Sequence, residues 1–215
     1  MVARLGNHRI VLAKQGSVAK LAQARKTLAN YFTRPIVRLL AKTPIVPNAL
    51  TWAGLVVNIG AAALVLTGHL FAAGLVVLLA GLFDTLDGAL ARSTNRTTKF
   101  GAVLDSTLDR LSEAAVLLSI LARYVDEQSA AAVVVVGLAL VGSLMVSYIR
   151  AKAEALGLKD EIGLFTRTER VVVLALGLLL SQIDYALITA LVLIMVFSFI
   201  TVSQRLLYVW QQTKN

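Results

Sequence analysis

The chain of 215 residues contains no cysteine, and few of its residues carry a charge. The absence of cysteine excludes disulfide bonds and leaves the redox compartment open. Charged residues make up only 15% of the chain, hydrophobic residues make up 58%, and the mean hydropathy is +0.77. Because a soluble domain needs more polar surface than this, the composition predicts a small polytopic membrane protein.

Acidic residues are also scarce relative to basic ones, which leaves a formal net charge of +9. The basic residues do not interleave with aromatic ones as on a nucleic-acid-binding face, so we expect lipid headgroups and anionic substrates as partners and no nucleic acid. No cleavable signal peptide is recognisable, because Arg4, Arg9 and Lys14 interrupt the first apolar residues.

Six apolar stretches are each near the roughly 20 residues that a bilayer-spanning helix needs. We expect them at about 49–67, 70–91, 101–122, 130–155, 171–182 and 184–209. The fifth is short, so its start is expected to reach back toward Thr168. Apolar residues at helical spacing with basic residues between them predict an amphipathic interfacial helix over 18–42, broken near Pro35; the alternative is a solvated basic tail.

The predicted fold is therefore an all-α integral membrane protein with six transmembrane helices plus an N-terminal amphipathic interfacial helix. Residues 1–42 form a basic juxtamembrane segment and residues 43–215 the membrane domain. With the N-terminus inside, every Lys and Arg except Arg110 and Arg123 falls in segments on the inner side. This asymmetry predicts a multi-pass protein of the plasma membrane with both termini cytoplasmic.

Four carboxylates lie near the facing ends of the second and third of these apolar stretches: Asp84 and Asp87, then Asp105 and Asp109. Spacings of three and four residues put each pair on one face of a helix, and the polar segment between them allows the two helices to form a hairpin. Four converging carboxylates repel one another unless cations lie between them. Hard oxygen ligands favour Mg²⁺, with Mn²⁺ tolerated, so we expect a metal and phosphate site on the cytoplasmic side.

The residues D-x2-D-G-x2-A-R-x8-G-x3-D-x3-D, from Asp84 to Asp109, resemble the signature of the CDP-alcohol phosphatidyltransferase family, and every position of it is met. The resemblance implies that a CDP-activated lipid donates a phosphatidyl group to an alcohol and that CMP leaves. It also implies two metal ions held by all four aspartates, with Asp109 as the general base. A homodimer is expected from the resemblance alone.

Donor contacts are expected on both sides of this motif. Gly88 lets a bulky group approach the backbone, and Arg92 offers a forked donor for phosphate. Thr98 precedes Gly101 and could donate to phosphate. By resemblance, Asn48 and Thr51 line the cytidine pocket; the alternative for Asn48 is a helix N-cap. The predicted CDP-lipid-binding residues are thus Asn48, Thr51, Gly88, Arg92 and Thr98.

Basic residues at the inner helix ends indicate a phosphorylated acceptor. The segments S-Y-I-R-A-K-A-E-A-L-G, G-L-F-T-R-T-E-R and S-Q-R-L-L-Y-V-W are similar to the bacterial phosphatidylinositol-phosphate synthase branch, which implies inositol 1-phosphate as acceptor. Glu154 and Glu169 are expected to pair with some of the basic residues. The predicted acceptor-phosphate-binding residues are Ser147, Arg150, Lys152, Arg167, Arg170 and Arg205.

Four other readings stay open at this point. Glycerol 3-phosphate as acceptor would make phosphatidylglycerophosphate, and an archaeal-type ether-linked donor would change only the lipid tails. An intramembrane prenyltransferase also uses aspartates and Mg²⁺, although its motifs are usually well separated. A cation transporter would place its acids near the bilayer midplane.

Overall fold

In the computed structural model, residues 37–39, 46–94, 97–158, 163 and 165–214 are described. Apart from a short helical stretch at 37–39, they form helices that follow one another along the chain, and no strand occurs among them. The bounds are α2 Pro47–Leu66, α3 Leu70–Ser93, α4 Lys99–Asp126, α5 Ala130–Ala155, α6 Arg167–Leu179 and α7 Ala186–Thr213. The all-α prediction is confirmed, and each predicted apolar stretch coincides with one helix.

Local sequence signals account for several helix ends. Thr98 is the N-cap of α4, and its hydroxyl accepts a hydrogen bond from the Gly101 N–H at 2.9 Å. Thr166 and Glu169 form a capping box at the start of α6. Gly68, with φ of +82°, follows the end of α2 in the left-handed conformation that glycine adopts readily. These signals fix where α4 and α6 begin, and both starts carry predicted site residues.

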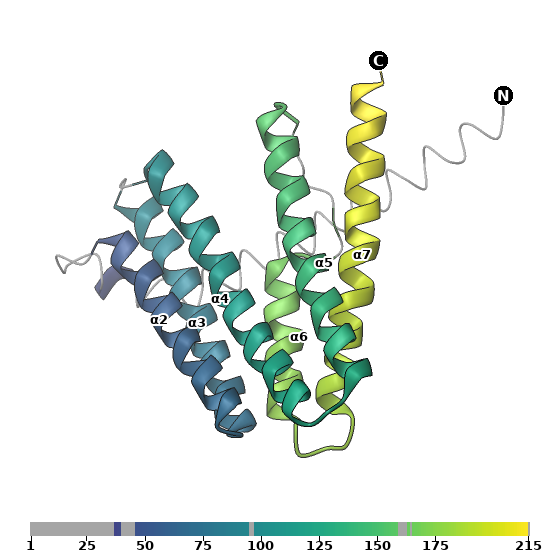
Figure 1. Ribbon diagram of the computed structural model, residues 1–215. Helices are drawn as coiled ribbons and strands as arrows, with labels where there is room; N and C mark the ends of the chain where they lie inside the picture. The colour runs from purple at the N-terminus through teal and green to yellow at the C-terminus, as the bar shows by residue number, and fades with distance from the viewer. Residues whose placement is uncertain (1–36, 40–45, 95–96, 159–162, 164, 215) are drawn as a thin grey trace, which may run out of the picture.

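The helices form two neighbouring groups (Figure 1). Helix α2 packs against α3 and α4, whereas α5 packs against α7. Helix α6 joins the groups, because it packs against both α3 and α7. Its contacts are close: a Cβ added to Gly177 would lie 2.5 Å from the Ala190 Cβ of α7, and one added to Gly74 of α3 would lie 2.9 Å from Leu179. Small residues thus allow α6 to sit tightly between its neighbours.

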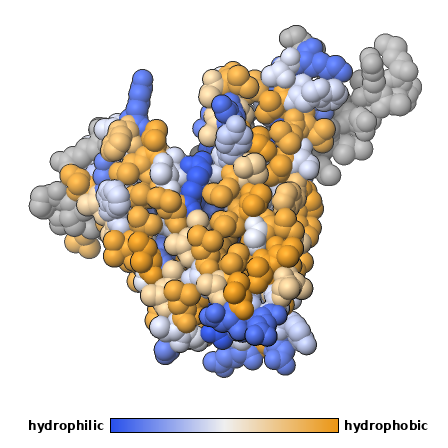
Figure 2. All heavy atoms as spheres, viewed as in Figure 1, coloured by the Kyte–Doolittle hydropathy of each residue, from blue (hydrophilic) through white to orange (hydrophobic). Residues whose placement is uncertain are grey.

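In the part of the chain that the structure describes, four helices, α2, α3, α5 and α7, are long and apolar enough to cross a membrane. Helix α4 is 28 residues long but carries several charged side chains, and α6 has only 13 residues. A broad band of apolar side chains covers the visible face, with hydrophilic side chains gathered toward its two ends (Figure 2). The chain is a multi-pass membrane protein. The predicted interfacial helix at 18–42 lies outside the described residues, except for the helical stretch at 37–39.

Candidate active site

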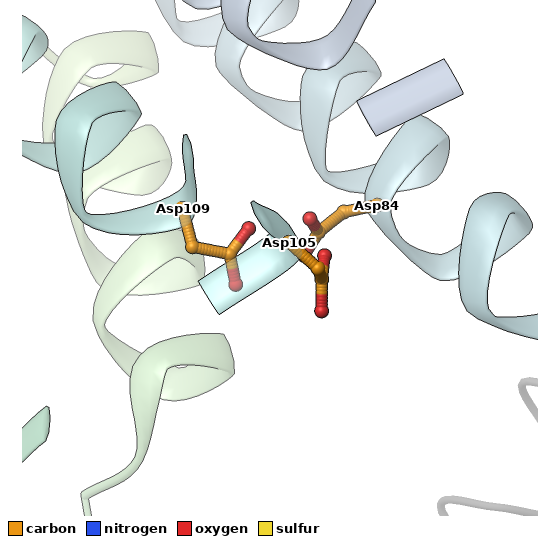
Figure 3. A group of neighbouring side chains, drawn as sticks. All are labelled: Asp84, Asp105 and Asp109. Atoms are coloured by element: carbon orange, nitrogen blue, oxygen red, sulfur yellow. The ribbon is translucent and has the colours of Figure 1, made fainter. Parts of the chain in front are cut away.

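Three of the four predicted metal-binding aspartates lie together. Asp84 comes from α3, and Asp105 and Asp109 come from one face of α4. Each offers a carboxylate oxygen, and these oxygens lie within 4.8 Å of one another. Figure 3 shows the three carboxylates turned toward the same space between the helices. Such a group could hold a divalent cation, because carboxylate oxygens are the ligands that Mg²⁺ and Mn²⁺ prefer.

Arg167, at the first position of α6, lies against this group. Its guanidinium pairs with Asp84 and, at 2.8 Å, with Asp109. One guanidinium offsets only one of the three negative charges, so the group retains a surplus of negative charge. Arg167 was predicted to bind the acceptor, and the structure places it directly beside the proposed base and metal ligands.

Asp87 is not among the three aspartates whose carboxylate oxygens lie within 4.8 Å of one another. It lies three residues after Asp84 on α3, is only 4% exposed and lines a pocket together with Thr51 of α2. One of its carboxylate oxygens, Oδ2, is buried and has no hydrogen-bond partner among the described residues. A buried carboxylate oxygen without a partner is costly, which is consistent with a ligand that completes its surroundings.

Asp87 lines a pocket of about 180 Å³ between the start of α2, the end of α3 and the start of α4. Asp105 also lines it, so the pocket adjoins the group of three carboxylates. All of the residues predicted to bind the CDP-lipid donor line this pocket: Asn48, Thr51, Gly88, Arg92 and Thr98. The structure therefore gathers residues that are up to 50 positions apart in the sequence.

Two glycines leave the space that this pocket needs. A Cβ added to Gly101 would lie 2.9 Å from the Thr98 hydroxyl oxygen and 3.3 Å from the Asn48 side-chain oxygen. A Cβ added to Gly88 would lie 3.3 Å from a guanidinium nitrogen of Arg92. The alternative reading of Asn48 as an N-cap is wrong, because the N-cap of α2 is Val46 and Pro47 takes the first helical position.

The predicted acceptor residues lie in different surroundings. Arg150 and Lys152 of α5 are exposed; Arg150 pairs with Glu154 at 2.9 Å, as expected, and Lys152 lies over the Tyr148 ring. Ser147 is half-buried. Arg205 of α7 is 3% exposed and donates a hydrogen bond to the Val146 carbonyl of α5 at 2.6 Å.

Arg170 is the most deeply enclosed of the predicted residues. It is 1% exposed and binds both carboxylate oxygens of Glu113, at 2.6 and 2.8 Å. Glu113 was not predicted as a site residue. It lies four positions after Asp109 and therefore on the same face of α4, a signal that could have identified it. Glu169, expected to pair with a basic residue, accepts a hydrogen bond from the Thr166 N–H at the start of α6.

Comparison with known proteins places this arrangement in a class. The family model for CDP-alcohol phosphatidyltransferases matches residues 44–208. The phosphatidylinositol phosphate synthase of Mycobacteroides abscessus is 36% identical over 85% of each chain. The archaetidylinositol phosphate synthase of Methanothermobacter thermautotrophicus is 33% identical over 88% of this chain and 97% of the relative.

Solved structures agree with this comparison. The Mycobacterium tuberculosis phosphatidylinositol phosphate synthase with CDP-DAG bound superposes with a TM-score of 0.76 at 38% identity, covering 83% of this chain and 93% of that one. The same enzyme in complex with manganese and citrate gives a TM-score of 0.74 over 83% and 88% of the two chains. The chain is thus a membrane-embedded transferase. It belongs to the CDP-alcohol phosphatidyltransferase family.

Proposed function

We propose that the chain transfers a phosphatidyl group from CDP-diacylglycerol to a hydroxyl of inositol 1-phosphate and releases CMP. The observation that carries this proposal is the pocket of about 180 Å³, which brings five predicted donor residues together beside Asp87 and Asp105. The relatives named as phosphatidylinositol phosphate synthases, one of them solved with CDP-DAG, support the same donor and acceptor.

Asp84, Asp87, Asp105 and Asp109 are proposed to hold two Mg²⁺ ions, with Mn²⁺ as a substitute. The close carboxylates and the unpartnered oxygen of Asp87 fit this assignment, and the related structure in complex with manganese supports it. When bound, such ions neutralise charge on a diphosphate and on the departing CMP.

The side chains around this centre are proposed to bind the donor and to accept the proton of the attacking hydroxyl. Arg92 and Thr98 bind phosphate oxygens of the donor, while Asn48 and Thr51 line the cytidine end of the pocket. Asp109 takes the proton of the attacking hydroxyl. The bond from that hydroxyl oxygen to the lipid phosphorus forms as the bond from phosphorus to the CMP oxygen breaks.

The acceptor phosphate is proposed to lie among the basic residues at the ends of α5, α6 and α7. Arg205 donates to the carbonyl of Val146, the residue before Ser147, so a guanidinium and a hydroxyl are available at this turn of α5. Arg150 and Lys152 are exposed about one turn further on, and Arg167 pairs with the aspartates. Arg170 does not face the acceptor in this proposal; its ion pair with Glu113 holds α6 against α4.

The arrangement in the membrane is also a proposal. We propose that α2 to α7 all span the bilayer, with charged α4 enclosed by its neighbours and short α6 continued by flanking residues. The active site is proposed to face the cytoplasm. In support, the end of α3, the start of α4, the end of α5 and the end of α7 lie toward the same end of the molecule (Figure 1). A homodimer is expected as well.

The proposal is tested by CMP release from CDP-diacylglycerol by purified protein with Mg²⁺. Parallel reactions contain inositol 1-phosphate, glycerol 3-phosphate, free inositol or no acceptor. Release that depends on inositol 1-phosphate supports the proposal. Release with glycerol 3-phosphate alone would keep the donor site and overturn the acceptor.

A second donor is favoured by one specific observation. The archaeal relative is named an archaetidylinositol phosphate synthase, and the match spans 97% of its length. The same acceptor reaction with an ether-linked CDP-activated lipid is therefore the second candidate. Running both donors against inositol 1-phosphate separates the two, because only the lipid tails differ.

A further inference from the structure

Arg110 has an uncompensated positive charge beside the proposed active site. It follows Asp109 directly on α4 and is half-buried. Its guanidinium donates hydrogen bonds to two backbone carbonyls, that of Ser106 on its own helix and that of Ser147 on α5, the latter at 3.3 Å. Both acceptors are neutral. Among the described residues, no carboxylate pairs with Arg110.

The other arginines of α4, α5 and α6 differ from Arg110 in this respect. Each has a carboxylate within 3 Å: Arg123 pairs with Glu127, Arg150 with Glu154, Arg167 with Asp109 and Arg170 with Glu113. Even a partly buried cation is costly when no opposite charge lies beside it. In a chain with few charged residues, such a cation requires a reason, and an anionic ligand would supply one.

Arg110 also contacts Ser147, one of the predicted acceptor residues. Arg205 of α7 donates to the carbonyl of Val146, and Arg110 of α4 donates to the carbonyl of the next residue, Ser147. Consecutive residues of an α-helix are only about 1.5 Å apart along its axis. The two guanidinium groups therefore approach the same turn of α5 from the helices on either side of it.

We propose that Arg110 is a further binding residue for the phosphate group of the acceptor, acting together with Arg205. Two arginines that approach one turn suit a phosphomonoester dianion, which accepts several charge-assisted hydrogen bonds. The neighbouring Asp109 would then face the hydroxyl of the same acceptor molecule. Arg110 thereby favours phosphorylated over unphosphorylated acceptors. This inference rests on the proposed function for the identity of the acceptor.

The test compares Arg110→Gln with Arg110→Lys and with the control Arg123→Gln. Arg123 lies at the opposite end of the same helix, so the control makes the same change of charge far from the site. Loss of a charge-assisted hydrogen bond predicts a KM for inositol 1-phosphate raised about 10- to 100-fold in Arg110→Gln. The KM for CDP-diacylglycerol is expected to stay within about twofold of the wild type, and Arg110→Lys to recover part of the loss.

A purely structural role makes a different prediction. If Arg110 only ties α4 to α5, Arg110→Gln lowers the melting temperature and leaves the KM for the acceptor unchanged, which overturns the proposal. An equal rise in both KM values also overturns it, because the substitution would then have disturbed the neighbouring Asp109.

A binding measurement keeps the result independent of turnover. Isothermal titration calorimetry with inorganic phosphate, without donor lipid, is expected to detect binding to the wild type and to Arg123→Gln, and at least about tenfold weaker binding to Arg110→Gln. Equal binding by all three proteins, or none by the wild type, overturns the role of Arg110. Because no CMP is formed in this experiment, its outcome is separate from any failure of the proposed reaction.

Discussion

Glu113 of α4 and Arg170 of α6 form a buried ion pair with two hydrogen bonds, at 2.6 and 2.8 Å. The pair joins helices whose main packing neighbours differ, since α4 packs mainly on α2 and α5 while α6 packs mainly on α3 and α7. One turn nearer the active site, Arg167 and Asp109 form a second contact between the same two helices, at 2.8 Å. The two contacts together set the position of the first turn of α6 against the aspartates.

Removing one partner of the buried pair should lower the free energy of unfolding far more than replacing both partners. Glu113→Gln leaves the Arg170 charge buried and unpaired, and we expect a loss of about 3–5 kcal/mol in the free energy of unfolding. The double variant Glu113→Leu/Arg170→Met replaces the pair with apolar side chains and should recover most of that loss. Thermal unfolding in detergent measures both. Equal stability of Glu113→Gln and the wild type would contradict the role of the pair.

Arg167 and a divalent cation should compete for the same carboxylates. In Arg167→Gln the competing charge is gone, so we expect Mn²⁺ to bind about tenfold more tightly even though turnover falls. Mn²⁺ binding followed by electron paramagnetic resonance tests this without any substrate, with Arg123→Gln as the control. Weaker Mn²⁺ binding in Arg167→Gln would mean that Arg167 supports the metal site and does not compete with the ion.

A side chain at position 101 should disturb donor binding, whereas a side chain at position 137 should have no effect. A Cβ at Gly101 would lie 2.9 Å from the Thr98 hydroxyl, but one at Gly137 would meet nothing within 4 Å. We expect Gly101→Ala to raise the KM for CDP-diacylglycerol roughly 5- to 10-fold, because Thr98 and Asn48 must shift. Gly137→Ala is the matched control and should leave the kinetics unchanged. An unaltered donor KM in Gly101→Ala would place the donor outside this pocket.

The absence of cysteine allows a direct test of membrane orientation. Asp184 lies in the loop between α6 and α7, and Lys214 follows the end of α7. In intact cells we expect a membrane-impermeant maleimide to label Asp184→Cys, and to label Lys214→Cys only after permeabilisation. The reverse pattern would place the active site on the outer side of the membrane.

The sequence was sufficient to predict the helices, because they depend on local patterns, and the residues that it singled out for the donor line one pocket. Apolar stretches mark α2 to α7, although the one at α6 is short, and fixed offsets place Gly88 and Arg92 near the aspartates. The start of α2 was not predicted correctly. Pro47 takes the first helical position and Val46 is the N-cap, so Asn48 lies inside the first turn of α2.

The remaining features depend on how the helices approach one another. Asp84 and Asp87 are three residues apart on α3, yet one faces α4 and the other the donor pocket. Sequence spacing alone cannot tell which neighbour each one meets. The same holds for Arg110 and Glu113, whose partners, Ser147 and Arg170, lie 37 and 57 residues away.

The most direct test of the central claim is the lipid product itself. Purified protein with Mg²⁺, CDP-diacylglycerol and inositol 1-phosphate should form phosphatidylinositol phosphate, identified by mass spectrometry, in equal amount to CMP. Asp109→Asn, which cannot accept the hydroxyl proton, should form none while still binding the donor lipid; Asp126→Asn, at the far end of α4, should behave as the wild type. CMP released without this lipid, or product formed at the wild-type rate by Asp109→Asn, would contradict the account.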